Sequence, residues 1–213
     1  MRVGVLHTVP ALVPVFHGLL TERRGDLDIV HTADASLLSR AIAGGITDDI
    51  EADLRSHVEA LRDAGAAAVL VTCSSIGEAA TDAAASVGVP LVRVDAAMAD
   101  EAVRRARAGR GRILVLATLS ATLGPTSRLV QSAAAGSDVE VTARVVADAA
   151  DARAAGDLER HDQLIAEAIA EAGDVDVIVL AQASMATGAG DGPRVLTSPE
   201  SGATRFVESL ATR

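Results

Sequence analysis

Short apolar runs alternate along the chain with longer stretches in which apolar residues recur every three or four positions. Runs of four to six Val, Ile and Leu residues are typical of strands that are buried on both faces of a sheet. The predicted strands are residues 2–7, 28–31, 67–72, 91–94, 112–117, 140–145 and 175–181. These runs alternate regularly with helical stretches along the chain.

Two of the intervening stretches show helical periodicity most clearly. Residues 47–64 predict a helix that Thr47 can cap, with an apolar stripe made of Ile50, Leu54, Val58 and Leu61. Residues 158–172 predict another, with a stripe made of Leu158, Leu164, Ile165 and Ile169. Strands that alternate with helices of this length predict an α/β fold built on doubly wound parallel sheets.

Segments of the first half of the chain are repeated in the second half. Residues 2–8 resemble residues 112–118, and residues 68–76 resemble residues 177–185. Arg112 follows Arg2 by 110 positions, and Gln182 follows Cys73 by 109. Any two buried strands look alike, but these matches continue past the strands into the loops. We therefore expect two similar lobes: residues 1–95, with a last helix of residues 198–213 packed back on them, and residues 96–197.

Composition removes several classes of function. The formal net charge is −10, and the chain has no Trp or Tyr and only two Phe, so we expect no nucleic-acid partner. The chain has no Lys, which excludes Schiff-base chemistry and a Walker-type P-loop. No apolar run approaches a membrane span, no leader segment is visible, and a lone Cys fits a reducing compartment. We expect a cytoplasmic protein with no membrane partner.

Ligands of open α/β sheets bind beyond the carboxyl ends of the strands, so the residues that follow the strands are the candidates. They are His7 and Thr8, Thr72 to Ser75, Thr118 to Thr122, and Gln182 to Ser184. A pseudo-two-fold axis between the lobes would place Cys73 and Gln182 at equivalent positions, facing one cleft. The other histidines, His17, His31, His57 and His161, have no metal-ligand spacing, and we expect them to be surface or packing residues. No metal or cofactor is expected.

The segment that ends at Cys73-Ser74-Ser75 resembles the first cysteine motif of the aspartate/glutamate/hydantoin racemase superfamily. Residues 114–122, which contain Thr118 and Thr122, resemble the opening strand and substrate loop of the second half of such proteins. The segment around Gln182 and Ser184 lies where the second cysteine motif belongs. The resemblance covers nearly the whole chain.

This resemblance implies a cofactor-independent, homodimeric isomerase that acts on a small carboxylate, with its active site in the cleft between two lobes. Two thiols would move a proton on opposite faces of the substrate's α-carbon. Backbone N–H groups and small hydroxyls would hold the carboxylate and stabilise the enediolate. The implied substrate-binding residues are His7, Ser74, Ser75, Thr118, Thr122 and Ser184.

The sequence departs from the family pattern at one decisive position, because Gln182 replaces the second cysteine. A glutamine amide can bind a substrate oxygen but cannot usefully exchange a proton near neutral pH. We expect Cys73 and Gln182 to be the central pair of the site, with the Cys73 pKa lowered by the helix that follows. A packing role remains the alternative for Cys73. Racemisation, decarboxylation by one thiol, and binding of a small carboxylate without catalysis all remain open.

Overall fold

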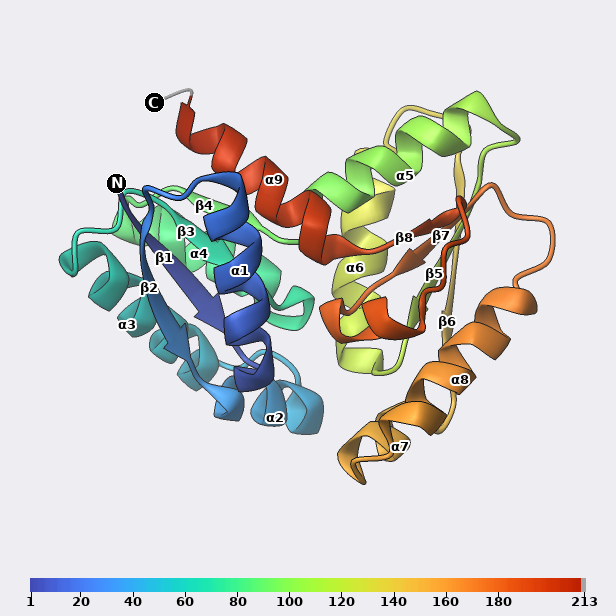
Figure 1. The fold of residues 1–213 in the computed structure, drawn as a ribbon, viewed down its shortest axis with the longest axis horizontal. Coiled ribbons are helices and arrows are strands. Elements are labelled where there is room, and N and C mark those ends of the chain that lie inside the picture. The colour runs from blue at the N-terminus through green and yellow to red at the C-terminus, as the bar shows by residue number, and fades with distance from the viewer. Residues whose placement is uncertain (212–213) are drawn as a thin grey trace. The chain divides into compact units, whose positions relative to one another are not determined.

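The computed structural model describes residues 1–211, and the chain divides into two compact units. Unit 1 comprises Met1–Val94 together with the segment from Pro199 onward, and unit 2 comprises Asp95–Ser198. Each unit contains one four-stranded parallel sheet with helices packed beside it (Figure 1). The predicted α/β class, with two similar parallel-sheet units, is confirmed.

In unit 1 the strand order is β2-β1-β3-β4. The strands are β1 (Arg2–His7), β2 (Asp28–Ala33), β3 (Val69–Val71) and β4 (Leu91–Arg93). The α-helices are α1 (Val13–Arg23), α2 (Ala35–Gly44), α3 (Asp48–Asp63), α4 (Gly77–Val87) and α9 (Ser198–Ala211). Two short 3-10 helices, η1 (Pro10–Leu12) and η2 (Ser74–Ile76), follow the ends of β1 and β3.

Unit 2 repeats this order as β6-β5-β7-β8. The strands are β5 (Arg112–Ala117), β6 (Glu140–Val145), β7 (Val177–Leu180) and β8 (Val195–Leu196). The helices are α5 (Ala96–Ala108), α6 (Ser120–Ala133), α7 (Ala149–Ala154), α8 (Leu158–Ala170) and the 3-10 helix η3 (Ala183–Gly188).

Alternation of side chains along the strands gives each sheet two apolar faces. In unit 2, Ile113 and Val115 of β5 belong to a core with residues of α5 and α6. Leu114 and Leu116 of the same strand belong to another core with residues of α7, α8 and η3. Because both faces are covered, these strands consist almost entirely of apolar residues, as in other doubly wound sheets.

The strand ends are set by equivalent hydrogen bonds in the two units. The Thr72 N–H donates to the Leu6 carbonyl at 3.0 Å, and the Ala181 N–H donates to the Leu116 carbonyl at 2.8 Å. Cys73 and Gln182 are the next residues, and each directly precedes a 3-10 helix. The two residues therefore occupy equivalent positions within their own units.

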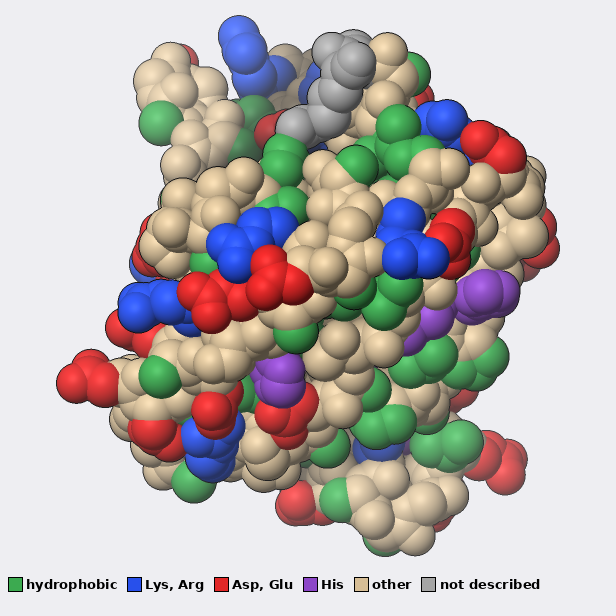
Figure 2. Space-filling view, turned by 90° about the vertical axis from the view of Figure 1, so that its left-hand side faces the viewer, with side chains coloured by type: hydrophobic (Ala, Val, Ile, Leu, Met, Phe, Trp, Pro, Cys, Tyr) green, Lys and Arg blue, Asp and Glu red, His purple; other side chains and the backbone are tan. Residues whose placement is uncertain are grey.

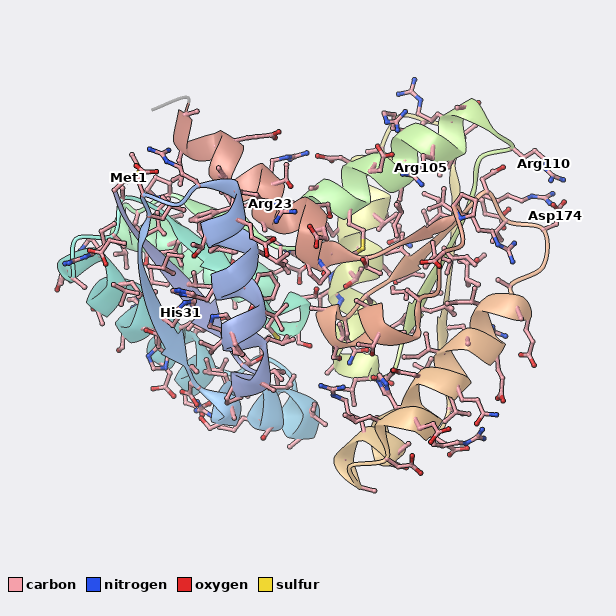
Figure 3. The ribbon with its side chains drawn as sticks, in the orientation of Figure 1. Met1, Arg23, His31, Arg105, Arg110 and Asp174 are labelled. Atoms are coloured by element: carbon pink, nitrogen blue, oxygen red, sulfur yellow. The ribbon has the colours of Figure 1, made fainter. Side chains whose placement is uncertain are left out.

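Helix α9 packs on unit 1 through α1 and the end of β4. Arg23, labelled in Figure 3, pairs with Glu200, and its Nε donates to Thr204 Oγ1 at 2.8 Å. Gly202 lies so close to the chain that a Cβ there would come within 2.3 Å of the Val94 carbonyl oxygen. Glycine is therefore required for this approach. Among residues 1–211, no helix is long and apolar enough to cross a bilayer.

Three local expectations need correction. Thr47 occupies the cap position of α3, but its hydroxyl binds the Asp49 carboxylate instead of the helix backbone. Leu158 is 53% exposed, because it begins α8 on the outer face, whereas Ile165 of the same expected stripe is buried. Strand β8 was not predicted, since two residues are too few to show a pattern. The stripe of α3 is buried as predicted.

Candidate functional site

Cys73 lies at the carboxyl edge of the unit 1 sheet, half-buried, directly after β3. Burial raises the pKa of its thiol above the usual range. The Thr8 hydroxyl, the N–H groups of Ile76 and Ser75, and the Ser75 hydroxyl act in the opposite direction. We expected the following helix to lower this pKa, and that expectation is wrong because burial outweighs the donors. The thiol is therefore protonated at neutral pH and surrounded by groups that stabilise its anion.

Thr8 is the first residue after β1, and it is buried beside the thiol. Within residues 1–211, no group lies in good hydrogen-bonding geometry to its buried Oγ1. Its action on Cys73 is therefore a weak contact with sulfur, which is a poor hydrogen-bond acceptor when protonated. A thiolate would accept a stronger hydrogen bond from this hydroxyl.

Unit 2 has an amide at the position that the thiol occupies in unit 1. The Gln182 Oε1 accepts the Thr118 N–H at 2.6 Å and the Thr118 hydroxyl at 3.0 Å. Two donors on one oxygen fix the orientation of the amide and leave its NH₂ group as the end that can donate to a ligand. Thr118 is engaged with Gln182 through both of these donors, and its expected role in substrate binding stays a prediction.

The pair Thr8 and Cys73 in unit 1 is equivalent in position to the pair Thr118 and Gln182 in unit 2. Each Thr follows the first strand of its unit. In both units this threonine acts on the residue that follows the third strand. The internal repeat of the sequence thus extends to side-chain contacts.

The remaining predicted ligands lie on the elements next to these pairs. Ser74 and Ser75 are buried in η2, Thr122 is buried in the first turn of α6, and Ser184 is half-buried in η3. Their role in substrate binding stays a prediction.

His7 is fully buried at the end of β1. Its Nδ1 lies 3.0 Å from Thr72 Oγ1, and its Nε2 lies 2.9 Å from His31 Nδ1. Burial, followed by the charge of His31, lowers the pKa of His7 to about 4. The imidazole is therefore neutral at pH 7.

Sequence reasoning missed two residues near this edge that the structure brings in. His31, expected to be a surface or packing residue, is half-buried and forms a hydrogen bond with His7 across the parallel pair of β1 and β2. Arg93 ends β4, and its guanidinium lies against the start of α4, where a Cβ on Gly77 would come within 2.7 Å of Arg93 Nε. Only the strand order, which the sequence does not state, places Arg93 beside β3. Among residues 1–211, no group of three or more His, Cys, Asp or Glu residues is arranged to hold a metal ion.

We predict that alkylation of Cys73 by iodoacetamide will accelerate with pH along a curve whose midpoint lies above that of an ordinary thiol, because burial disfavours the thiolate. Thr8→Val should move the midpoint higher still, since it removes a group that lowers the pKa. The rate is measured by mass spectrometry of the native protein at a series of pH values. A midpoint below that of free cysteine, or no effect of Thr8→Val, would contradict this account of the thiol.

We also predict that acid weakens the fold through His7. Its pKa is about 4 in the folded protein and about 6.5 in the unfolded chain, so its contribution is complete above pH 6.5 and disappears as the pH falls to 4. The loss amounts to roughly 3 kcal/mol. The free energy of unfolding, measured with urea at several pH values between 4 and 6.5, should fall less steeply with decreasing pH for His7→Gln than for the wild type. Equal slopes in this window would show that His7 titrates normally.

The sequence matches the family model described as Asp/Glu/hydantoin racemase over residues 25–195. No curated protein matches the sequence. Among solved structures, glutamate racemase isoform RacE1 from Bacillus anthracis is 16% identical, with a TM-score of 0.71, covering 99% of this chain and 82% of that one. The aspartate racemase of Picrophilus torridus is 13% identical, with a TM-score of 0.73, covering 99% and 94%.

A mutant of arylmalonate decarboxylase, solved in a sulfate-associated form, shares the fold as well. It is 20% identical, with a TM-score of 0.59, covering 99% of this chain and 92% of that one. At these identities the structural likeness establishes the fold alone, whereas the family model spans most of the chain. The chain belongs to the Asp/Glu/hydantoin racemase family.

Proposed function

We propose that the protein is a cofactor-independent carbon-acid enzyme of the isomerase type, which moves a proton at the carbon next to the carboxylate of a small substrate. Cys73 is the acid and base of this reaction. The observation that carries the proposal is the environment of its thiol, in which burial keeps the proton on sulfur while neighbouring N–H and O–H groups stabilise the thiolate. Such a thiol can both donate a proton and take it back.

Two kinds of donor among the predicted site residues suit the rest of this chemistry. Small hydroxyls and backbone N–H groups at Ser74 and Ser75 suit a substrate carboxylate, whose second negative charge develops as the enediolate forms. The Gln182 NH₂ group is a further neutral donor, because Thr118 occupies the amide oxygen. The family resemblance also implies a homodimer in the cytoplasm, and both belong to this proposal.

Decarboxylation is the second candidate, favoured by Gln182. An amide cannot take or return a proton near neutral pH, so proton transfer rests on one thiol. A decarboxylase needs only one: the C–C bond to the carboxylate breaks, CO₂ leaves, and the thiol protonates the resulting carbanion. The likeness to arylmalonate decarboxylase adds only that this fold is compatible with such a protein.

We predict that the wild type exchanges the α-hydrogen of a small carboxylate, or replaces a lost carboxylate with solvent hydrogen, in deuterium oxide. Proton NMR of a panel that includes aspartate, glutamate and arylmalonates measures both, and released CO₂ identifies decarboxylation. Cys73→Ser should lower the rate by about 10² or more, since it removes a positioned acid–base group. Ser86→Ala, at the far end of α4, is the matched control. Tight binding of a carboxylate without exchange or CO₂ release would instead identify a binding protein.

We predict that Gln182→Cys increases racemisation above the wild-type rate, because it restores the two-thiol pattern of the family. The new side chain is smaller than the amide, and the Thr118 hydroxyl would act on it as the Thr8 hydroxyl acts on Cys73. Racemisation is followed by polarimetry or chiral chromatography. Cys73→Ser in the same background should abolish the gain. Efficient racemisation by the wild type would show that a second base, which we have not identified, already operates.

A further inference from the structure

His161 is a fully buried histidine near the start of α8, and one end of its ring is held by a carboxylate. Its Nδ1 lies 2.8 Å from Asp162 Oδ1, which also accepts the Thr187 hydroxyl at 2.8 Å. A carboxylate only accepts hydrogen bonds, so Nδ1 of the neutral ring carries the proton and Nε2 carries a lone pair. Among residues 1–211, none forms a hydrogen bond with this buried Nε2.

A buried ring nitrogen without a partner costs free energy, so its presence calls for an explanation. Histidine side chains in other parts of the chain reach the surface, where water can bind them (Figure 2), but His161 is 0% exposed. The His161 and Asp162 pair has the arrangement of a general base. The carboxylate fixes the orientation of the ring and stabilises the imidazolium that proton uptake at Nε2 would form.

The start of α8 lies at the carboxyl edge of the unit 2 sheet. This helix connects the end of β6 to the start of β7, and the two strands run parallel, so the helix returns along the sheet from the carboxyl edge. Contacts with η3, which follows β7, agree with this placement. Thr187 binds Asp162, and a Cβ on Gly188 would come within 2.9 Å of the Asp162 carbonyl oxygen. His161 thus lies at the edge that carries Gln182.

His161 and Gln182 also lie on the same face of this sheet. Leu180 of β7 and Ile165 of α8 belong to one core, whereas Ala181 belongs to the core on the other face. Side chains alternate along extended backbone, so Gln182 returns to the face of Leu180. His161 lies one helical turn before Ile165, which is about 6 Å along the axis, and two strand residues span about 6.6 Å. His161 therefore lies near the level of Gln182.

The helix beside the thiol of unit 1 offers no such group. The core that Cys73 packs against includes the buried residues of α3, which are all apolar from Ile50 to Leu61. Among residues 95–198, the buried ionisable side chains are Asp95 and His161. Asp95 directly precedes α5, which packs on the face of the unit 2 sheet opposite α8. On the face that carries the amide, the buried ionisable group is an imidazole.

We infer that His161 is the second base that the proposed function leaves unidentified, an inference that rests on the proposed function. The neutral ring takes the α-proton of the carboxylate substrate at Nε2, and the electron pair of the C–H bond passes into the enediolate. Asp162, a positioning residue, stabilises the resulting imidazolium. Inversion is completed when Cys73, the acid of the proposed function, gives its proton to the carbon. The reverse reaction begins with the thiolate and the imidazolium, so the substrate loses one proton and gains one in either direction.

The test compares L- and D-aspartate and L- and D-glutamate, each incubated separately in deuterium oxide and followed by proton NMR. A base that serves one face of the carbon takes the α-proton from one enantiomer only. His161→Gln should therefore slow exchange of that enantiomer by about 10² and leave exchange of the other nearly unchanged. Cys73→Ser should have its larger effect on the other enantiomer. His57→Gln, at a histidine that also pairs with a carboxylate, is the matched control and should change neither rate.

Asp162→Asn keeps an acceptor for Nδ1 but removes the charge that stabilises the imidazolium, so it should slow the same enantiomer by a smaller factor. The Asp162 side chain is 33% exposed, so this variant decides the question if His161→Gln does not fold.

Equal slowing of both enantiomers, or no slowing, would overturn the role of His161 and leave the proposed function standing. Release of CO₂ by the wild type without α-exchange would also overturn it, since that reaction needs no second base. A wild type that neither exchanges hydrogen nor releases CO₂ would overturn the proposed function itself, and the role of His161 with it.

Discussion

The parallel register of the two central strands in each unit determines where the chemistry of this protein can lie. Thr72 bonds to Leu6, and Ala181 bonds to Leu116, so the first and third strands of each sheet end together. One residue later, each pair of ends presents a threonine beside a second side chain that is either Cys73 or Gln182. A shift of one strand's register by one residue would turn its side chain at this point to the opposite face of the sheet. The two apolar faces oppose that shift, since consecutive residues of β5 and of β7 belong alternately to one core and the other.

Burial and hydrogen bonding compete at Cys73, and their balance decides the kind of chemistry available. Removal from water disfavours the thiolate, and the N–H groups of η2 together with two hydroxyls favour it. Burial prevails, so the resting group is an acid and not a preformed nucleophile. An acid that can become a stabilised base suits proton transfer to and from carbon. It suits covalent attack less well, because that reaction needs a thiolate at the outset.

The local pattern of residues was sufficient to predict features that each strand shows in its own sequence. The strand positions, the duplicated halves and the equivalence of Cys73 with Gln182 follow from apolar runs and from the repeated spacing. What depends on neighbours in space could not be predicted. His31 shows nothing on its own strand that marks it as a partner of His7, and the strand order alone joins them. Likewise, the direction of the Cys73 pKa depends on how deeply the whole unit buries the thiol, which no motif encodes. Leu158 fits the periodicity of its helix but lies at an end that the core does not reach.

The two units share one strand order and differ in the side chains that it places after the strands. In unit 1, threonine acts on a thiol, and histidines occupy the strand positions behind it. In unit 2, threonine holds an amide, and alanines occupy those positions. A thiol can give up and take back a proton, whereas an amide near neutral pH can only form hydrogen bonds. The threonine of unit 1 therefore adds a donor to a group that becomes charged when it loses its proton. The threonine of unit 2 fixes an amide whose NH₂ group can only donate a hydrogen bond. The repeated backbone does not repeat the chemistry, and a symmetric two-base reaction would need a second base other than Gln182.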